Sequence, residues 1–103
     1  MRVILRYKNY VLKKEKRDLI ESQSQDLNYL MPIDSIKWNI EHSNGEYILS
    51  AKVLAPKINL FSRGTGRTLQ EAVSNTLDSL EIQMSKFSKP KKGWRELEFK
   101  KTA

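Results

Sequence analysis

The sequence contains no cysteine and a single histidine, and these two shortages remove much of the chemistry that small proteins use. Without cysteine the chain has no disulfide, no thiolate zinc ligand and no cysteine nucleophile. His42 has no second histidine to complete a transition-metal site, and any serine nucleophile would depend on it alone. Because it stands beside a predicted turn, we interpret His42 as a solvated turn residue. We therefore expect no metal and no cofactor.

Long hydrophobic runs are also missing. No apolar run approaches the roughly 18 residues that a membrane-spanning helix needs. Arg2 and Arg6 interrupt the apolar amino terminus, so no secretory hydrophobic segment of about 7 to 15 residues forms there. Of the 103 residues, 39% are hydrophobic and 30% are charged, which is typical of a globular domain. We expect a cytosolic protein with no membrane partner and one domain, residues 1–90.

Alternating apolar and polar residues predict four strands, at residues 2–8, 33–42, 47–55 and 57–63. Asn44-Gly45 favours a tight hairpin turn between the second and third strands. Apolar residues at helical spacing predict one helix from about residue 12 to Pro32. Thr68 and Glu71 form a capping-box pattern that starts a second helix, which ends before Pro90.

The order strand, helix, strand, strand, strand, helix indicates an α+β fold. We expect the β-α-β-β-β-α chain to form a two-layer sandwich, a four-stranded sheet with two helices packed on one face. Residues 91–103 contain Lys-Lys-Gly and lack a period, so we predict a basic, flexible carboxyl-terminal tail. Trp38 belongs to the core pattern. Phe61 is a candidate for stacking on a base, and Trp94 in the tail either stacks on a base or packs back on the sheet.

The net charge of +7 lies at the two ends of the chain. Residues 1–17 hold seven cations against Glu15, and the stretch from Lys86 onward holds seven cations against two glutamates. Cations at Lys13 to Arg17 oppose the dipole of the helix they begin, so helix propensity does not account for them. Such clusters attract polyanions, and we expect structured RNA as the partner. The candidate RNA-binding residues are Arg6, Lys8, Lys13, Lys14, Lys16, Arg17, Arg63, Arg67, Lys86, Lys89, Lys91 and Lys92.

Nothing in the sequence favours an enzyme. Gly64-Thr65-Gly66 lacks the Lys-Ser/Thr ending of a P-loop and the third glycine of a dinucleotide site, and we interpret it as a strand-to-helix turn. The carboxylates lie among polar neighbours, without the apolar pocket that acid-base catalysis needs. We expect no catalysis and no small-molecule substrate.

Several features occur in a familiar order: the Asn44-Gly45 hairpin, the strand before Pro56, Gly64-Thr65-Gly66, and the helix that starts at Leu69-Gln70-Glu71-Ala72-Val73. On these residues the segment Ile33 to Lys92 resembles the ribosome hibernation-promoting factor family, which includes the ribosome-associated inhibitor of translation. The resemblance implies the short form of that family and the same element order. It also implies that basic residues of the two helices hold ribosomal RNA in the mRNA and tRNA channel of the small subunit. Translation would then be inhibited by occupancy in starved or stationary-phase cells.

Where relatives carry lysines midway along the first helix, this chain has Gln23 and Asp26. Its basic charge has moved to Lys13 to Arg17 and to the tail. We expect a monomer off the ribosome. The alternative hypothesis is a diverged protein-protein interaction module of the same fold that regulates a non-ribosomal partner through its acidic middle or an exposed sheet edge.

Overall fold

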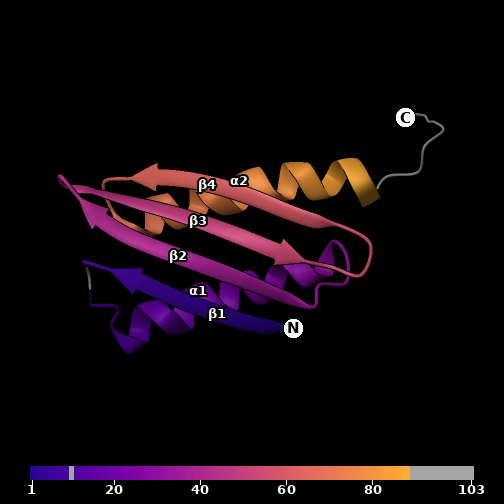
Figure 1. Ribbon diagram of the computed structural model, residues 1–103, viewed down its shortest axis with the longest axis horizontal. Helices are drawn as coiled ribbons and strands as arrows, with labels where there is room; N and C mark the ends of the chain where they lie inside the picture. The colour runs from indigo at the N-terminus through magenta and orange to yellow at the C-terminus, as the bar shows by residue number, and fades with distance from the viewer. Residues whose placement is uncertain (10, 89–103) are drawn as a thin grey trace.

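The structure, a computed structural model, describes residues 1–9 and 11–88. The predicted tail, Trp94 and three of the candidate cations, Lys89, Lys91 and Lys92, lie outside the described residues. A four-stranded sheet carries two helices on one face (Figure 1). The elements are β1 (Arg2–Lys8), α1 (Lys14–Asp26), a 3-10 turn (Leu27–Tyr29), β2 (Ser35–Ser43), β3 (Glu46–Leu54), β4 (Asn59–Gly66) and α2 (Leu69–Ser88). The predicted α+β sandwich and its element order are confirmed.

The strands lie in the sheet in the order in which they occur in the chain. β1 is parallel to β2, and the two are joined through α1; β2, β3 and β4 are antiparallel. The predicted hairpin is confirmed, because Ser43 pairs with Glu46 across a two-residue turn. Both turn residues have positive φ, 53° at Asn44 and 77° at Gly45, which is the backbone that an Asn-Gly pair tolerates best.

His42 does not lie in that turn. It is half-buried near the end of β2, and its ring stacks on the ring of Tyr47 across the hairpin, with the centroids 4.4 Å apart. The interpretation of a solvated turn residue is wrong, because the strand continues as far as Ser43 and pairs His42 with an aromatic neighbour.

The core lies between the sheet and the helices, with Trp38 of β2 fully buried at its centre. The indole Nε1 of Trp38 donates a hydrogen bond of 2.9 Å to Oγ of Ser24, which is buried in α1. Ser24 in turn donates a bond of 2.6 Å to the Ile20 carbonyl oxygen. A buried indole N–H needs an acceptor, so the serine joins α1 to the middle of the sheet. The assignment of Trp38 to the core is confirmed.

The first helix is shorter than predicted. It ends at Asp26 and continues only as a 3-10 turn, although apolar residues at helical spacing extend to Met31. The side-chain oxygen of Asn28 accepts a hydrogen bond of 2.9 Å from the backbone N–H of Ile33, which holds the chain in its return to the sheet. Leu12, expected within the helix, is buried just before it.

The second helix starts as predicted, with one change in the cap. Oγ1 of Thr68 accepts a hydrogen bond of 3.1 Å from the backbone N–H of Glu71, as the capping box requires. Oε1 of Glu71, however, accepts a bond of 2.9 Å from the backbone N–H of Arg67 and not from that of Thr68. The helix ends at Ser88, before Pro90.

Gly64 and Gly66 belong to β4, whose last residue is Gly66, so the interpretation of Gly64-Thr65-Gly66 as a strand-to-helix turn is wrong. α2 packs directly on this strand. A Cβ atom at Gly64 would lie 2.7 Å from the backbone nitrogen of Thr76, and one at Gly66 would lie 2.6 Å from that of Ala72. The glycines are therefore explained by the close approach of helix and strand.

Candidate nucleic-acid interface

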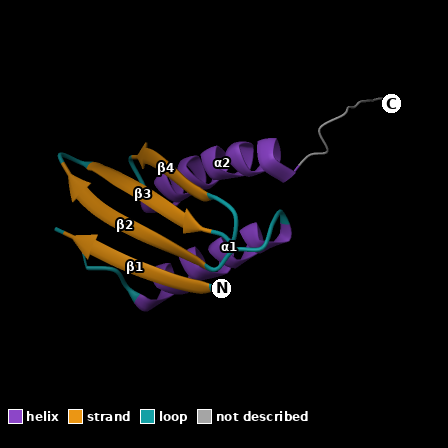
Figure 2. Ribbon diagram, turned by 45° about the vertical axis from the view of Figure 1, so that its right-hand side comes forward, coloured by secondary structure: helices purple, strands orange, loops and turns teal. Residues whose placement is uncertain are grey.

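No other element of residues 1–9 and 11–88 packs on one face of the sheet. Both helices pack against the opposite face, as the turned view makes clear (Figure 2). Strand alternation directs a second set of side chains outward, and we call this surface the open sheet face. Its cations are Arg2, Arg6, Lys8, Lys37, Lys52 and Arg63, and its carboxylates are Glu41 and Glu46. Six cations against two carboxylates give this face a net charge of +4.

The pairing register places the outward residues in rows that cross the sheet. In one row Arg6 pairs with Asn39, Asn39 with Ser50, and Ser50 with Arg63. Because neighbouring strands are about 4.8 Å apart, the backbones of the two arginines are about 14 Å apart. This row therefore carries a cation at each of its two ends, and neutral polar side chains lie between them.

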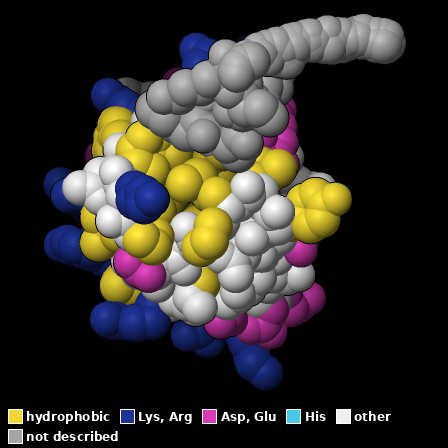
Figure 3. Space-filling model, turned by 90° about the vertical axis from the view of Figure 1, so that its right-hand side faces the viewer, with side chains coloured by type: hydrophobic (Ala, Val, Ile, Leu, Met, Phe, Trp, Pro, Cys, Tyr) yellow, Lys and Arg dark blue, Asp and Glu magenta, His cyan; other side chains and the backbone are white. Residues whose placement is uncertain are grey.

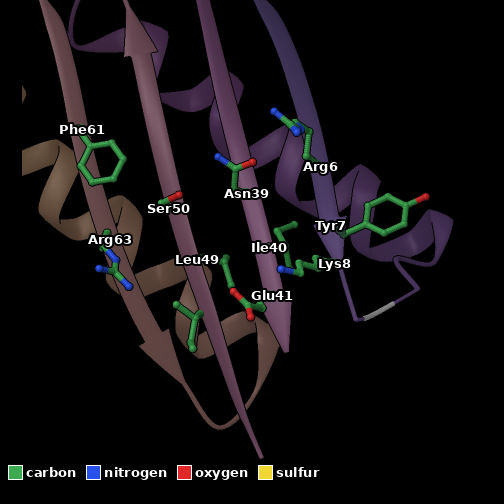
Figure 4. A pocket seen from close by; sticks show the side chains of 11 residues that line it. Arg6, Tyr7, Lys8, Asn39, Ile40, Glu41, Leu49, Ser50, Phe61 and Arg63 are labelled. Atoms are coloured by element: carbon green, nitrogen blue, oxygen red, sulfur yellow. The ribbon is translucent and has the colours of Figure 1, made fainter. Parts of the chain in front are cut away.

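A shallow hollow of about 400 Å³ follows this row (Figure 4). Phe61 lines it from β4 and is 55% exposed, which agrees with the sequence-based hypothesis that this ring is accessible. In the close-up, Phe61 and Arg63 project from β4, while Arg6 lies across the sheet on β1. The hollow is open to solvent, so it suits an extended ligand more than an enclosed small molecule.

The starts of the two helices form a second cationic region, which we call the basic end. α1 and α2 both begin where β1 and β2 finish, and Lys16 of α1 and Arg67 just before α2 line one hollow of about 420 Å³. Lys13 is the N-cap residue of α1, and its side chain makes no capping hydrogen bond. The exposed cations of this region are Lys13, Lys14, Lys16, Arg17 and Arg67.

The structure thus divides the described candidates into three groups. Arg6, Lys8 and Arg63 lie on the open sheet face, and the basic end holds five more. Lys86 is separate, because 17 residues of helix rise put it about 25 Å from the start of α2.

Three cations of the open sheet face, Arg2, Lys37 and Lys52, are absent from the sequence-based candidates. The same alternation that predicted the strands carried the signal for them, since each faces away from the buried residues beside it. Lys37 and Lys52 pair directly across β2 and β3, and this becomes visible only once the register is known.

The helix layer carries the opposite charge. From Asp18 to Asp26, α1 has three carboxylates and no cation, and α2 has three carboxylates against Lys86. Figure 3 shows the molecule from the right-hand side of Figure 1: Lys and Arg lie along the left and lower edges, and most Asp and Glu lie on the right. Among the described residues, the positive surface is therefore the open sheet face together with the basic end.

Two carbonyl groups of β4, the last strand of the sheet, accept hydrogen bonds from α2. Nε2 of Gln83 donates to the carbonyl oxygen of Phe61 at 3.0 Å, and Nδ2 of Asn75 donates to that of Thr65 at 2.8 Å. Side chains of α2 thus satisfy outward backbone groups that another strand would otherwise pair with.

Within residues 1–9 and 11–88, no three His, Asp or Glu side chains are grouped so that they would hold a metal ion. No helix in the same ranges is long and apolar enough to cross a membrane. What the described surface offers is a broad cationic face that carries the exposed ring of Phe61.

No protein-family model matches the sequence, and neither does any curated protein at a significant level. Solved structures do match the fold. A ribosomal subunit interface protein from Coxiella burnetii superimposes with a TM-score of 0.73 at 20% identity, covering 84% of this chain and 97% of that one. The N-terminal domain of Protein Y from Thermus thermophilus superimposes with a TM-score of 0.78 at 19% identity, covering 84% and 99%. The chain therefore has the fold of these two proteins along almost their whole length.

Proposed function

We propose that the protein binds ribosomal RNA of the small subunit and inhibits translation by occupying the mRNA and tRNA channel in starved or stationary-phase cells. It acts in the cytoplasm as a monomer, by occupancy and without catalysis. The observation that carries the proposal is the open sheet face, where six cations oppose two carboxylates. The likeness to a ribosomal subunit interface protein supports the choice of partner.

The charge arrangement suits a polyanion with regularly spaced phosphates. Each phosphate that a lysine or arginine neutralises releases condensed counterions, so the logarithm of affinity falls by about 0.7 to 0.9 per contact for each unit in the logarithm of salt concentration. The open sheet face and the basic end adjoin at Lys8, the last residue of β1, only a few residues before Lys13. Together the two regions provide cations for several phosphate contacts with one large RNA.

Co-sedimentation with purified small subunits tests this proposal. We expect strong pelleting at about 50 mM salt and little at about 500 mM. Replacing Lys13, Lys14, Lys16 and Arg17 together by glutamine should weaken pelleting and reduce its dependence on salt. Lys57→Gln is the matched control, since this exposed cation lies outside both cationic regions.

Equal pelleting at the two salt concentrations contradicts the proposal. Unchanged binding by the fourfold variant would leave the ribosome as partner but remove the basic end from the contact.

The acidic helix layer favours one second candidate, a protein-protein interaction module of the same fold that regulates a non-ribosomal partner. Gln83 and Asn75 occupy two carbonyl groups of edge strand β4, and the carboxylates of α1 offer such a partner a surface of the opposite charge to the open sheet face. A pull-down dominated by one non-ribosomal protein and insensitive to ribonuclease would select this function.

A further inference from the structure

We infer that the open sheet face takes an unpaired RNA strand, with one base stacked on Phe61 and the adjoining phosphates held by Lys52 and Arg63. This inference rests on the proposed function and names the part of the RNA that the protein contacts. It assigns the direct contact to the sheet, and it turns the acidic helix layer away from the RNA.

Phe61 is the first observation. The ring is 55% exposed on a bare face, so burial in the core does not explain a phenylalanine at this position. Aromatic rings on open sheet surfaces stack on nucleotide bases, and such stacking tolerates any base because every base has a π-face. The backbone beneath the ring is fixed, since Gln83 of α2 holds the Phe61 carbonyl.

The neighbours of Phe61 are the second observation. Lys52 is its direct partner on β3, and Arg63 lies two residues further along β4 on the same face. Two residues of strand cover about 7 Å, so a base placed on the ring has a cation on two sides. This is the combination of a stacking ring with cations along the backbone that single-strand binding surfaces use.

The row of residues from Arg63 to Arg6 gives the RNA strand a path across the sheet. Ser50 and Asn39 lie between the two arginines, and they supply a hydroxyl and an amide that both donate and accept hydrogen bonds. The distance of about 14 Å across the sheet accommodates about four nucleotides of an unpaired strand at about 3.4 Å each. The hollow along this row leaves room for them (Figure 4).

A duplex fits this surface less well. In a double helix the bases are stacked on each other and their faces are hidden, so Phe61 has no partner and projects between the phosphates and the cations. An acidic polypeptide would satisfy the cations but would gain nothing specific from the ring. Of these three ligands, only unpaired RNA uses both the ring and the cations.

Binding of the full-length protein to a labelled single-stranded RNA of about ten nucleotides tests the inference by fluorescence anisotropy. Phe61→Ala should weaken binding by about 5- to 150-fold, as expected for one lost base stack, with an unchanged salt slope. Phe61→Trp should retain or strengthen binding. Arg63→Gln should instead lower the salt slope by about 0.7.

Tyr29→Ala is the matched control, because Tyr29 is a 92% exposed aromatic residue outside the sheet, and its removal should leave the affinity unchanged. A duplex of the same sequence and a polyglutamate chain should compete poorly. The inference is overturned if Phe61→Ala binds as tightly as the wild type, or if either competitor displaces the RNA at equal concentration.

Pelleting with small subunits separates this inference from the proposed function. Salt-sensitive pelleting of both the wild type and Phe61→Ala, with equal affinities, overturns the stacking contact and keeps ribosome binding. Loss of pelleting by the wild type itself overturns the proposed function, whatever the oligonucleotide shows.

Discussion

Substituting Ser24 by alanine should destabilise the fold by much more than its small change in volume suggests. Ser24 and Trp38 are both fully buried, and Oγ of Ser24 is the acceptor for the indole N–H. Removing Oγ leaves that N–H buried without this partner, at a cost of about 1 to 3 kcal/mol.

Helix propensity works in the opposite direction, since alanine is the better helix former by up to about 0.5 kcal/mol. Ser22→Ala corrects for this gain, because Ser22 is exposed in the same helix. Relative to Ser22→Ala, the Ser24→Ala variant should lose about 1 to 3 kcal/mol of unfolding free energy. At about 4 to 8 °C per kcal/mol, its Tm should be lower by at least about 4 °C.

Urea and thermal unfolding followed by far-ultraviolet circular dichroism measure this difference. A double-mutant cycle with Trp38→Phe isolates the hydrogen bond, since phenylalanine keeps most of the ring and lacks the N–H. In the Trp38→Phe background, Ser24→Ala should cost less than in the wild type by about 1 kcal/mol or more. Equal stability of the two serine variants, or a coupling energy near zero, would refute the reasoning.

Two further variants test local packing by the same unfolding measurement. Gly64→Ala should cost about 3 kcal/mol, the upper end of overpacking effects, because the added methyl group meets the backbone of Ala72 and Thr76, which cannot rotate away. Its control is Thr65→Ala, which lies outward on the same strand and should cost no more than about 1 kcal/mol. Similar losses for the two variants would argue against the tight contact between helix and strand. Thr68→Ala removes the cap of α2 and should also cost about 1 kcal/mol of unfolding free energy. Its control is Ser74→Ala, which is exposed inside that helix and should be neutral or slightly stabilising. A neutral Thr68→Ala would show that the cap contributes nothing to stability.

The fold followed from local patterns in the sequence. The alternation around Trp38 and the Asn44-Gly45 turn each specify one structure, because strand period and turn geometry depend on neighbouring residues. The end of α1 did not follow, since its apolar spacing continues past Asp26, where the Asn28 contact with Ile33 takes over. That contact depends on tertiary structure.

The candidate site was predictable only in part. Arg6 and Arg63 were found as cations, but their place in one row requires the register of all four strands. Lys37 and Lys52 were overlooked because they stand in a stretch whose charges cancel along the chain. The net charge of a stretch of sequence differs from the net charge of a face of the folded sheet, and a ligand contacts the face.

The opposite charges of the two layers have a kinetic consequence. A sheet face of +4 behind which the helices carry excess carboxylate makes the molecule a permanent electric dipole. Near a polyanion such a dipole experiences a torque that turns its more positive side forward. Screening confines this effect to about 8 Å at physiological ionic strength. The protein is thus oriented during the last nanometre of diffusion, and its charge pattern affects the rate of association before any contact forms.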